Sequence, residues 1–200
     1  MSAMVIIFTP IVSLLSFAEA ENVKKFTDKV AQELIVNMRD PNVSETEKRA
    51  KVKAIINENF DVMWMSKFAL GINYRKLSSA QKAKYESLYS NYLLNNYFPI
   101  LMRYDSDDSY EILKIQQVDP KDYDVKLKLI TKKAENPIML KYRIRYTGQN
   151  YKCLDMVVEG ISTLISQRAE FTSVIQKSGI SSFLNTLEKQ KIKSTMPSSS

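Results

Sequence analysis

The spacing between apolar residues changes along this chain from three or four positions to two, and this change constrains the fold more than any other feature. In residues 125–129 and 138–146, apolar side chains alternate with lysine and arginine. Such alternation is typical of antiparallel strands with one buried face and one wet face. We expect flanking strands at 110–118 and 151–159, and a tight hairpin turn at 147–150.

Helical patterns lie on both sides of these strands. Ser44 with Glu47 and Ser78 with Gln81 have the spacing of capping boxes, and Pro99 is expected to bend or break the longest helix near its end. The predicted helices span 23–39, 45–60, 62–70, 79–104, 162–177 and 180–191. The sequence therefore predicts an α+β domain in which a four-stranded antiparallel sheet carries helices packed on one face.

The first twenty residues have the features of a signal peptide. An apolar run from Met4 to Phe17 precedes Ala18-Glu19-Ala20. The run is short for a bilayer span, and the two alanines suit a signal peptidase. We expect cleavage after Ala20, one domain over 21–193 and a disordered tail at 194–200. The alternative is an uncleaved anchor, because no lysine or arginine precedes the apolar run.

Composition excludes several kinds of chemistry. The chain has no histidine and one cysteine, Cys153, so it can form neither an internal disulfide, nor a Cys/His metal cluster, nor a Ser/His/Asp triad. We predict no catalytic residue, metal or cofactor. For the acidic loop 105–108 solvation is the simple explanation, and for Asp155 and Glu159, on one strand face, a structural hydrogen bond or ion pair is favoured.

The net charge is +7 at neutral pH. An excess of positive charge indicates nucleic acid or an anionic membrane as a partner, and export argues against nucleic acid. The other interpretation is that many of the lysines are simply solvated.

The long predicted helix carries a wide aromatic stripe that includes Tyr85, Tyr89, Tyr92 and Tyr97. Ordinary core packing is one explanation. The other is a binding pocket, because this stripe can face the apolar sides of the strands. Periodicity does not distinguish a filled space from a hollow one.

Three segments carry a family resemblance. The first is Phe60-Asp61-Val62-Met63 with Leu70-Gly71-Ile72-Asn73-Tyr74, and the second is residues 97–104, Tyr-Phe-Pro-Ile-Leu-Met-Arg-Tyr. The third is residues 151–162, Tyr-Lys-Cys-Leu-Asp-Met-Val-Val-Glu-Gly-Ile-Ser, followed by 167–171, Gln-Arg-Ala-Glu-Phe. In this order and spacing they resemble the MlaC family, periplasmic phospholipid-binding proteins also called the toluene-tolerance family. Tyr74 and Tyr151 stand where that family usually has tryptophan.

The resemblance implies a soluble periplasmic carrier and not an enzyme. It would shuttle phospholipid between an outer-membrane lipoprotein complex and an inner-membrane ABC-type lipid transporter complex, and so maintain lipid asymmetry of the outer membrane. The implied fold of 21–193 is a nuclear-transport-factor-like cone with an apolar cavity for acyl chains, for which we expect a volume of about 1,000 Å³. Transient contact with a membrane surface is also expected.

Laying the periodicity over that fold gives the residues expected to bind lipid. They are Phe60, Met63, Phe68, Leu70, Tyr89, Leu93, Tyr97, Leu101, Val125, Leu127, Leu129, Ile138, Leu140, Tyr142 and Ile144. Arg75, Arg103 and Arg143 are candidates for contact with a lipid head group or a partner protein.

Two other functions stay open at this point. Cones of this type host small-molecule enzymes, which would need a carboxylate or tyrosine with a shifted pKa at the base of the cavity. A basic interaction module with a solid core is the second alternative.

Overall fold

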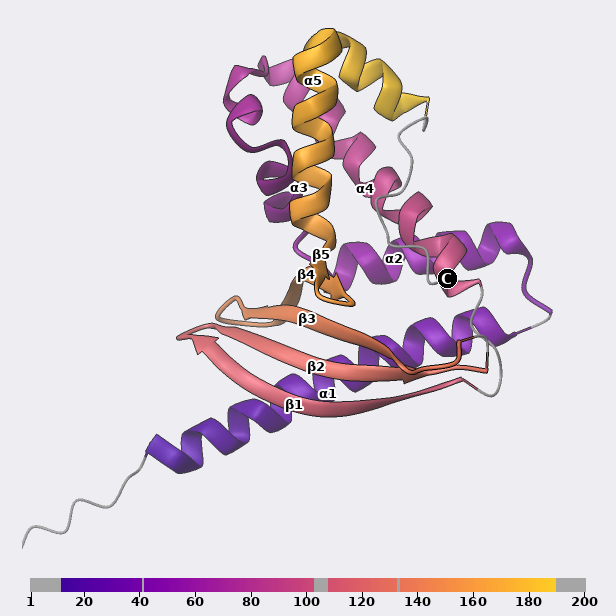
Figure 1. The fold of residues 1–200 in the computed structure, drawn as a ribbon, viewed down its shortest axis with the longest axis vertical. Coiled ribbons are helices and arrows are strands. Elements are labelled where there is room, and N and C mark those ends of the chain that lie inside the picture. Colours follow the sequence, from indigo (N-terminus) through magenta and orange to yellow (C-terminus); the bar gives the residue numbers. More distant parts are fainter. Residues whose placement is uncertain (1–11, 41, 103–107, 133, 190–200) are drawn as a thin grey trace, which may run out of the picture.

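The computed structural model describes residues 12–40, 42–102, 108–132 and 134–189. Figure 1 shows an antiparallel sheet crossed by one long helix, with a lobe of further helices beyond one sheet edge. In chain order the elements are α1 (Val12–Arg39), α2 (Glu45–Asn59), α3 (Val62–Leu70), the 3₁₀ helix η1 (Gly71–Lys76), α4 (Ser79–Leu101), β1 (Ser109–Asp119), β2 (Asp122–Ile130), β3 (Ile138–Tyr146), β4 (Tyr151–Val158), β5 (Ile161–Ser162) and α5 (Thr163–Glu188).

The sheet has five strands in the order β1-β2-β3-β4-β5, and each neighbouring pair is antiparallel. The prediction of four strands is wrong, because the structure has a fifth strand, the short β5. Glu159 and Gly160 both adopt positive φ, 48° and 82°, which reverses the chain tightly enough for Ile161 to pair with Val158. A strand of two residues is too short to show any alternation, so the sequence pattern does not reveal it.

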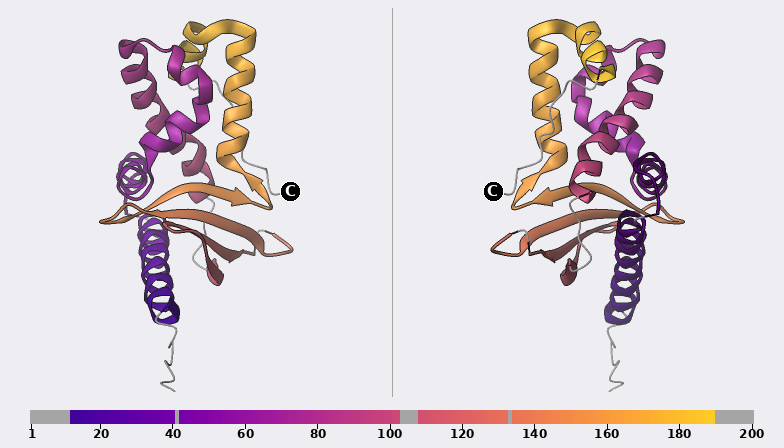
Figure 2. Two further views of the ribbon diagram at one scale, coloured as in Figure 1. Left: turned by 90° about the vertical axis from the view of Figure 1, so that its left-hand side faces the viewer. Right: turned by 90° about the vertical axis from the view of Figure 1, so that its right-hand side faces the viewer.

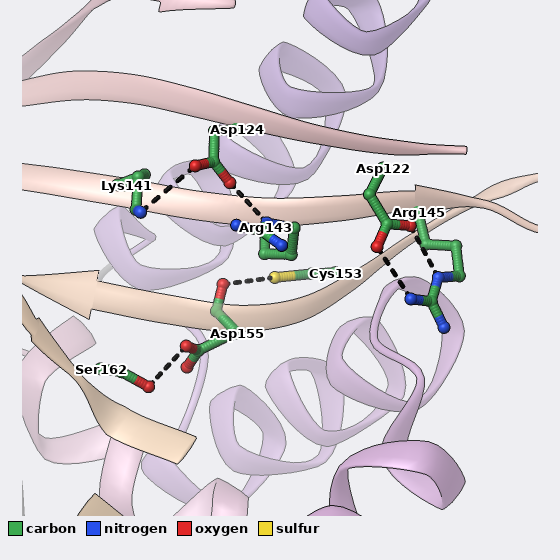
Figure 3. Close-up of polar contacts among 8 residues, drawn as sticks. All are labelled: Asp122, Asp124, Lys141, Arg143, Arg145, Cys153, Asp155 and Ser162. Atoms are coloured by element: carbon green, nitrogen blue, oxygen red, sulfur yellow. Dashed lines mark hydrogen bonds and ion pairs between the residues drawn. The ribbon is translucent and has the colours of Figure 1, made fainter. Parts of the chain in front are cut away.

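The two faces of the sheet differ sharply. Tyr123, Val125 and Ile144 are buried on the inner face. The outer face, turned away from α1, carries cross-strand ion pairs (Figure 3). Arg145 donates to both carboxylate oxygens of Asp122 at 2.7 and 2.8 Å. This is the period-two pattern expected from the sequence.

The sequence predicted helices packed on one face of the sheet, but in the structure the helices do not all pack on one face. Helix α1 lies along the inner face and comes closest to β1 among the strands, whereas α2, α3 and α5 contact β4. In the side views of Figure 2, the lobe containing α3, α4 and α5 rises on one side of the sheet and α1 extends on the other. The short strand β5 pairs with β4 at the edge of the sheet and leads the chain into α5 there.

The lobe has its own aromatic core, which absorbs most of the stripe on α4. Tyr85, Tyr89, Phe171 and Phe183 are fully buried there. The rings of Phe171 and Phe183 lie 5.0 Å apart, and the hydroxyl of Tyr89 donates to the side-chain oxygen of Gln167 at 2.7 Å. Because its hydroxyl has this hydrogen-bond partner, Tyr89 can be buried completely.

Local capping signals predict the helix ends well. Both capping boxes form, at Ser44 with Glu47 and at Ser78 with Gln81. Asp61 accepts from the backbone N–H of Trp64 at the start of α3. The two helices predicted after residue 162 form one element, α5, interrupted by non-helical Gly179.

Several predictions fall partly or wholly outside the described residues. These are the first part of the signal peptide, most of the acidic loop 105–108, Arg103 and the tail 194–200. Helix α1 runs across the expected cleavage site after Ala20. Within the part of the chain that the structure describes, no helix is both long and apolar enough to span a membrane.

Asp155 ties the sheet to α5. Its carboxylate accepts from the hydroxyl of Ser162 at 2.6 Å, the hydroxyl of Thr163 at 3.3 Å and the backbone N–H of Leu164 at 3.1 Å. The negative charge also lies at the amino end of the helix, where the helix dipole favours it. This side chain therefore fixes the angle at which the helical lobe leaves the sheet.

We expect Asp155→Ala to lower the free energy of unfolding by about 2 kcal/mol, because it leaves several donors without their acceptor. Urea denaturation would measure this. Asp155→Asn is the control: it keeps one acceptor oxygen and should lose less. Equal stability of Asp155→Ala and the wild type would contradict this role.

Glu170, on α5, should make stability depend on pH. One oxygen of its half-buried carboxylate is fully buried and without a hydrogen-bond partner among the described residues, and burial raises its pKa to about 7 from 4.5. Between these two pH values the folded state holds a proton that the unfolded chain releases, so this group lowers stability as pH rises from about 4.5 to about 7.

Glu170→Gln removes this effect. Above about pH 7 we expect the variant to melt about 2–4 °C higher than the wild type, a small shift because solvent reaches half of the group. Near about pH 4 the two should melt together, since both states of the wild type are then protonated. Thermal melts across this range, with Glu135→Gln as an exposed control, would test it, and a gap that does not depend on pH would refute it.

Candidate functional site: an apolar cavity between helix α1 and the sheet

An apolar cavity lies between α1 and the inner face of the sheet, and its volume is about 110 Å³. This is much smaller than the expected volume of about 1,000 Å³. Its walls are almost entirely apolar. The lining residues are Phe26, Thr27, Val30, Ala31, Leu34 and Ile35 of α1, Phe60, Leu101, and Tyr110, Leu127, Leu129, Leu140, Tyr142, Ile144 and Cys153 of the sheet.

The cavity exists because α1 makes full contact with the sheet near only part of its length. Val23 is completely buried against Tyr123, Val125 and Ile144, where the space between helix and sheet is filled. Farther along the helix, Thr27 and Ala31 line a cavity that Leu127 and Leu140 line from the sheet. The alternation of the strands keeps charged side chains on the other face, so the wall of the cavity formed by the sheet is apolar.

Seven of the residues predicted to bind lipid line this cavity: Phe60, Leu101, Leu127, Leu129, Leu140, Tyr142 and Ile144. The others lie elsewhere. Leu70, Tyr89, Leu93 and Tyr97 are buried in the core of the helical lobe. Val125 packs against α1 at Val23, and Ile138 is half-buried at the start of β3.

The remaining two predicted residues belong to α3. Phe68 stacks on Trp64 at a ring distance of 5.2 Å, and the guanidinium of Arg168 lies 5.1 Å from its ring centre. Met63 is 46% exposed to solvent. The long aromatic stripe thus serves mainly as lobe core, because α4 packs on α2 and α5 along most of its length and approaches the cavity only near Leu101.

Sequence reasoning missed the wall that α1 provides. The helix predicted over 23–39 has apolar residues every three or four positions, and three of them, Phe26, Val30 and Leu34, line the cavity. Periodicity shows that such a face is buried but does not identify its partner. Cys153, expected to pack as a small apolar residue, is buried in the wall of the cavity.

The polar atoms of the cavity wall are engaged in local bonds. The hydroxyl of Thr27 donates to the carbonyl of Val23 at 2.9 Å, and that of Tyr110 donates to Asp28 at 2.9 Å. The thiol of Cys153 donates to the carbonyl of Asp155 at 3.5 Å, and burial raises its pKa. A neutral thiol is a weak nucleophile, so this wall favours apolar binding over covalent chemistry.

Carboxylates are not part of the described cavity lining. The two sequence candidates have structural bonds: Asp155 caps α5, and Glu159 accepts from the backbone N–H of Met139 at 2.5 Å. Among the residues that the structure describes, no cluster of three or more His, Cys, Asp or Glu side chains could hold a metal ion. The geometry here suits a ligand that is recognised by its apolar surface.

Of the three arginines proposed for head-group or partner contact, the two that the structure describes, Arg75 and Arg143, are not among the residues that line the cavity. Arg143 lies on the outer face of the sheet, where its Nε donates to Asp124 at 2.5 Å (Figure 3). Strand alternation places it on the face opposite Ile144, so it does not reach the cavity from its own strand position. Arg75 is exposed on η1, and Arg103 is outside the described residues.

Comparison with known proteins agrees with this architecture. The structure is similar to that of the phospholipid-binding protein from Ralstonia solanacearum solved in complex with a phospholipid, with a TM-score of 0.74 and 16% sequence identity over 83% of this chain and 94% of that chain. At this identity the similarity shows the shared fold. The sequence model of the family described as MlaC protein matches residues 28–189, which include α1 from Asp28 onward, the whole sheet and the helical lobe. The chain therefore belongs to the MlaC family.

Proposed function

We propose that this protein is a phospholipid carrier, not an enzyme, and that acyl chains bind between α1 and the inner face of the sheet. The observation that carries this proposal is the cavity, whose described lining has apolar side chains from both elements and no carboxylate. Membership of the MlaC family and a similar fold that holds a phospholipid in another protein support it.

The energetics require an enclosed site. Each methylene group moved from a membrane into water costs about 0.8 kcal/mol, so a phospholipid does not cross an aqueous compartment unaided. The present cavity of about 110 Å³ is too small for two acyl chains. Lipid uptake therefore requires the cavity to widen, and we propose that α1 moves away from β2 and β3 beyond Val23, where the helix and the sheet enclose the cavity.

We place this activity in the periplasm, after export by the signal peptide of residues 1–20. The carrier would receive and deliver lipid at an outer-membrane lipoprotein complex and an inner-membrane ABC-type lipid transporter complex, and so maintain outer-membrane lipid asymmetry. Support for these partners comes from the family. The same scheme includes transient contact with a membrane surface.

Filling the cavity should remove the lipid without unfolding the protein. We expect Ala31→Phe and Leu127→Trp to reduce co-purifying phospholipid about tenfold or more, because the added ring occupies the acyl-chain space. Native mass spectrometry followed by lipid extraction would measure this. Ala83→Phe, at an exposed position of α4, is the control. Wild-type protein without lipid, even after incubation with phospholipid vesicles, would refute the carrier proposal.

Cys153 offers an independent measure of occupancy, because it is the single thiol of the chain and is buried in the cavity wall. We expect N-ethylmaleimide to modify lipid-loaded protein slowly and delipidated protein faster, with the unfolded chain as the upper limit. Mass spectrometry over time would follow the reaction. Equal rates with and without lipid would place the ligand away from Cys153.

A further inference from the structure

The turn between α3 and α4 forms an exposed tip at the end of the helical lobe farthest from the sheet (Figure 1). Within this turn, Leu70, Asn73 and Leu77 point inward and are buried. Ile72 points outward and is 68% exposed, the highest value among the exposed large apolar side chains of the described residues. A single exposed isoleucine is ordinary on a protein surface, so its surroundings decide whether it has a role.

The surroundings of Ile72 are strongly basic. Residues 62–85 contain five lysines and arginines and no acidic residue. Lys84 pairs with Glu188, whereas Lys67, Arg75, Lys76 and Lys82 have no carboxylate partner among the described residues. This differs from the outer face of the sheet, where the arginines are paired with aspartates.

The tip is held in a defined shape. The ammonium groups of Lys67 and Lys82 lie 5.7 and 5.3 Å from the ring centre of Tyr74, and the Tyr74 hydroxyl donates to Glu86. Gly71 has a φ of 56°, and a side chain there would meet the Arg168 guanidinium at about 3.0 Å. Contacts with the ring of Tyr74 keep both lysines beside the turn that carries Ile72.

We propose that this tip, made of Lys67, Ile72, Arg75, Lys76 and Lys82, docks on the surface of an anionic phospholipid bilayer. Cations near such a surface are each attracted by about 1 kcal/mol, and an apolar side chain between them can enter the boundary of head groups and acyl chains. The tip presents an exposed apolar side chain, Ile72, which a fluid bilayer accommodates. An acidic protein surface would have to supply a matching pocket for Ile72.

This inference goes beyond lipid carriage and adds a membrane anchor at a second place on the molecule. The tip lies at one end of the lobe, whereas α1 and the sheet, which enclose the cavity, lie at the other (Figure 1). Docking by the tip would hold the protein at a membrane and leave the cavity accessible to partner complexes. The proposed carrier function gives the anchor its purpose, but the binding itself can be measured separately.

Vesicle co-sedimentation tests the proposal directly. The probes are vesicles of phosphatidylcholine with phosphatidylglycerol, and vesicles of phosphatidylcholine alone, each at low and high salt. We expect the wild type to bind only the anionic vesicles and to dissociate at high salt. Arg75→Ala/Lys76→Ala should weaken binding about thirtyfold and Ile72→Ser about tenfold.

Matched controls separate the tip from overall charge and hydrophobicity. Ile165→Ser removes another isoleucine that is 62% exposed, and Lys114→Ala/Lys126→Ala removes two exposed lysines that lie opposite each other on the outer face of the sheet. Both controls should bind vesicles nearly as the wild type does. Circular dichroism of every variant checks that the fold is intact.

Each result has a clear meaning. Equal losses in the tip variants and the lysine control would show that overall charge drives binding, which overturns the proposal. If the wild type does not bind anionic vesicles, the proposal is also overturned, and an acidic protein becomes the favoured partner of the tip. Lipid extraction from the same samples separates the two proposals. Tip variants should keep their bound lipid. A protein that carries no lipid but still binds anionic vesicles would refute only the carrier function.

Discussion

The apolar inner face of the sheet has to be covered, and α1 is the helix that covers it. This contact is tight at Val23, which is fully buried against Val125 and Ile144. Beyond that point α1 and the sheet are no longer in full contact, and a cavity lies between the helix and Leu127 and Leu140. Because α1 covers the sheet closely over only part of its length, a cavity remains between them, and the rest of the fold holds α1 and the sheet in this relation.

The outer face of the sheet carries ion pairs between neighbouring strands. Asp124 accepts from both Lys141 and Arg143, and Asp122 accepts from Arg145, so much of the positive charge in β3 is neutralised across strands. The bond from Arg145 lowers the pKa of Asp122. Burial alone would raise the pKa of Asp124, but the bonds from Arg143 and Lys141 lower it. The positive charge of β3 is therefore largely compensated on the sheet itself. At the tip of the helical lobe, Lys67, Arg75, Lys76 and Lys82 have no carboxylate partner among the described residues.

Much of the fold follows from local signals. The capping side chains Ser44, Asp61 and Ser78 place helix starts where the structure has them, and the change to period two locates four of the five strands. The sequence does not predict strand β5, because two residues are too few to show an alternating pattern. Asp155 could be assigned a structural bond from the sequence, but its partners are seen only after β5 folds back.

For the site, the sequence by itself determined chemistry and sidedness: a chain without histidine, with one thiol, and with strands whose apolar side chains share one face. Only the tertiary structure decided which apolar residues enclose a cavity and which fill a core. Tyr89 and Leu127 both occupy regular apolar positions, yet Tyr89 packs in the lobe and Leu127 lines the cavity. The reason is that periodicity reports which side of an element is buried, whereas the presence of a cavity depends on the distance at which a second element packs against that side.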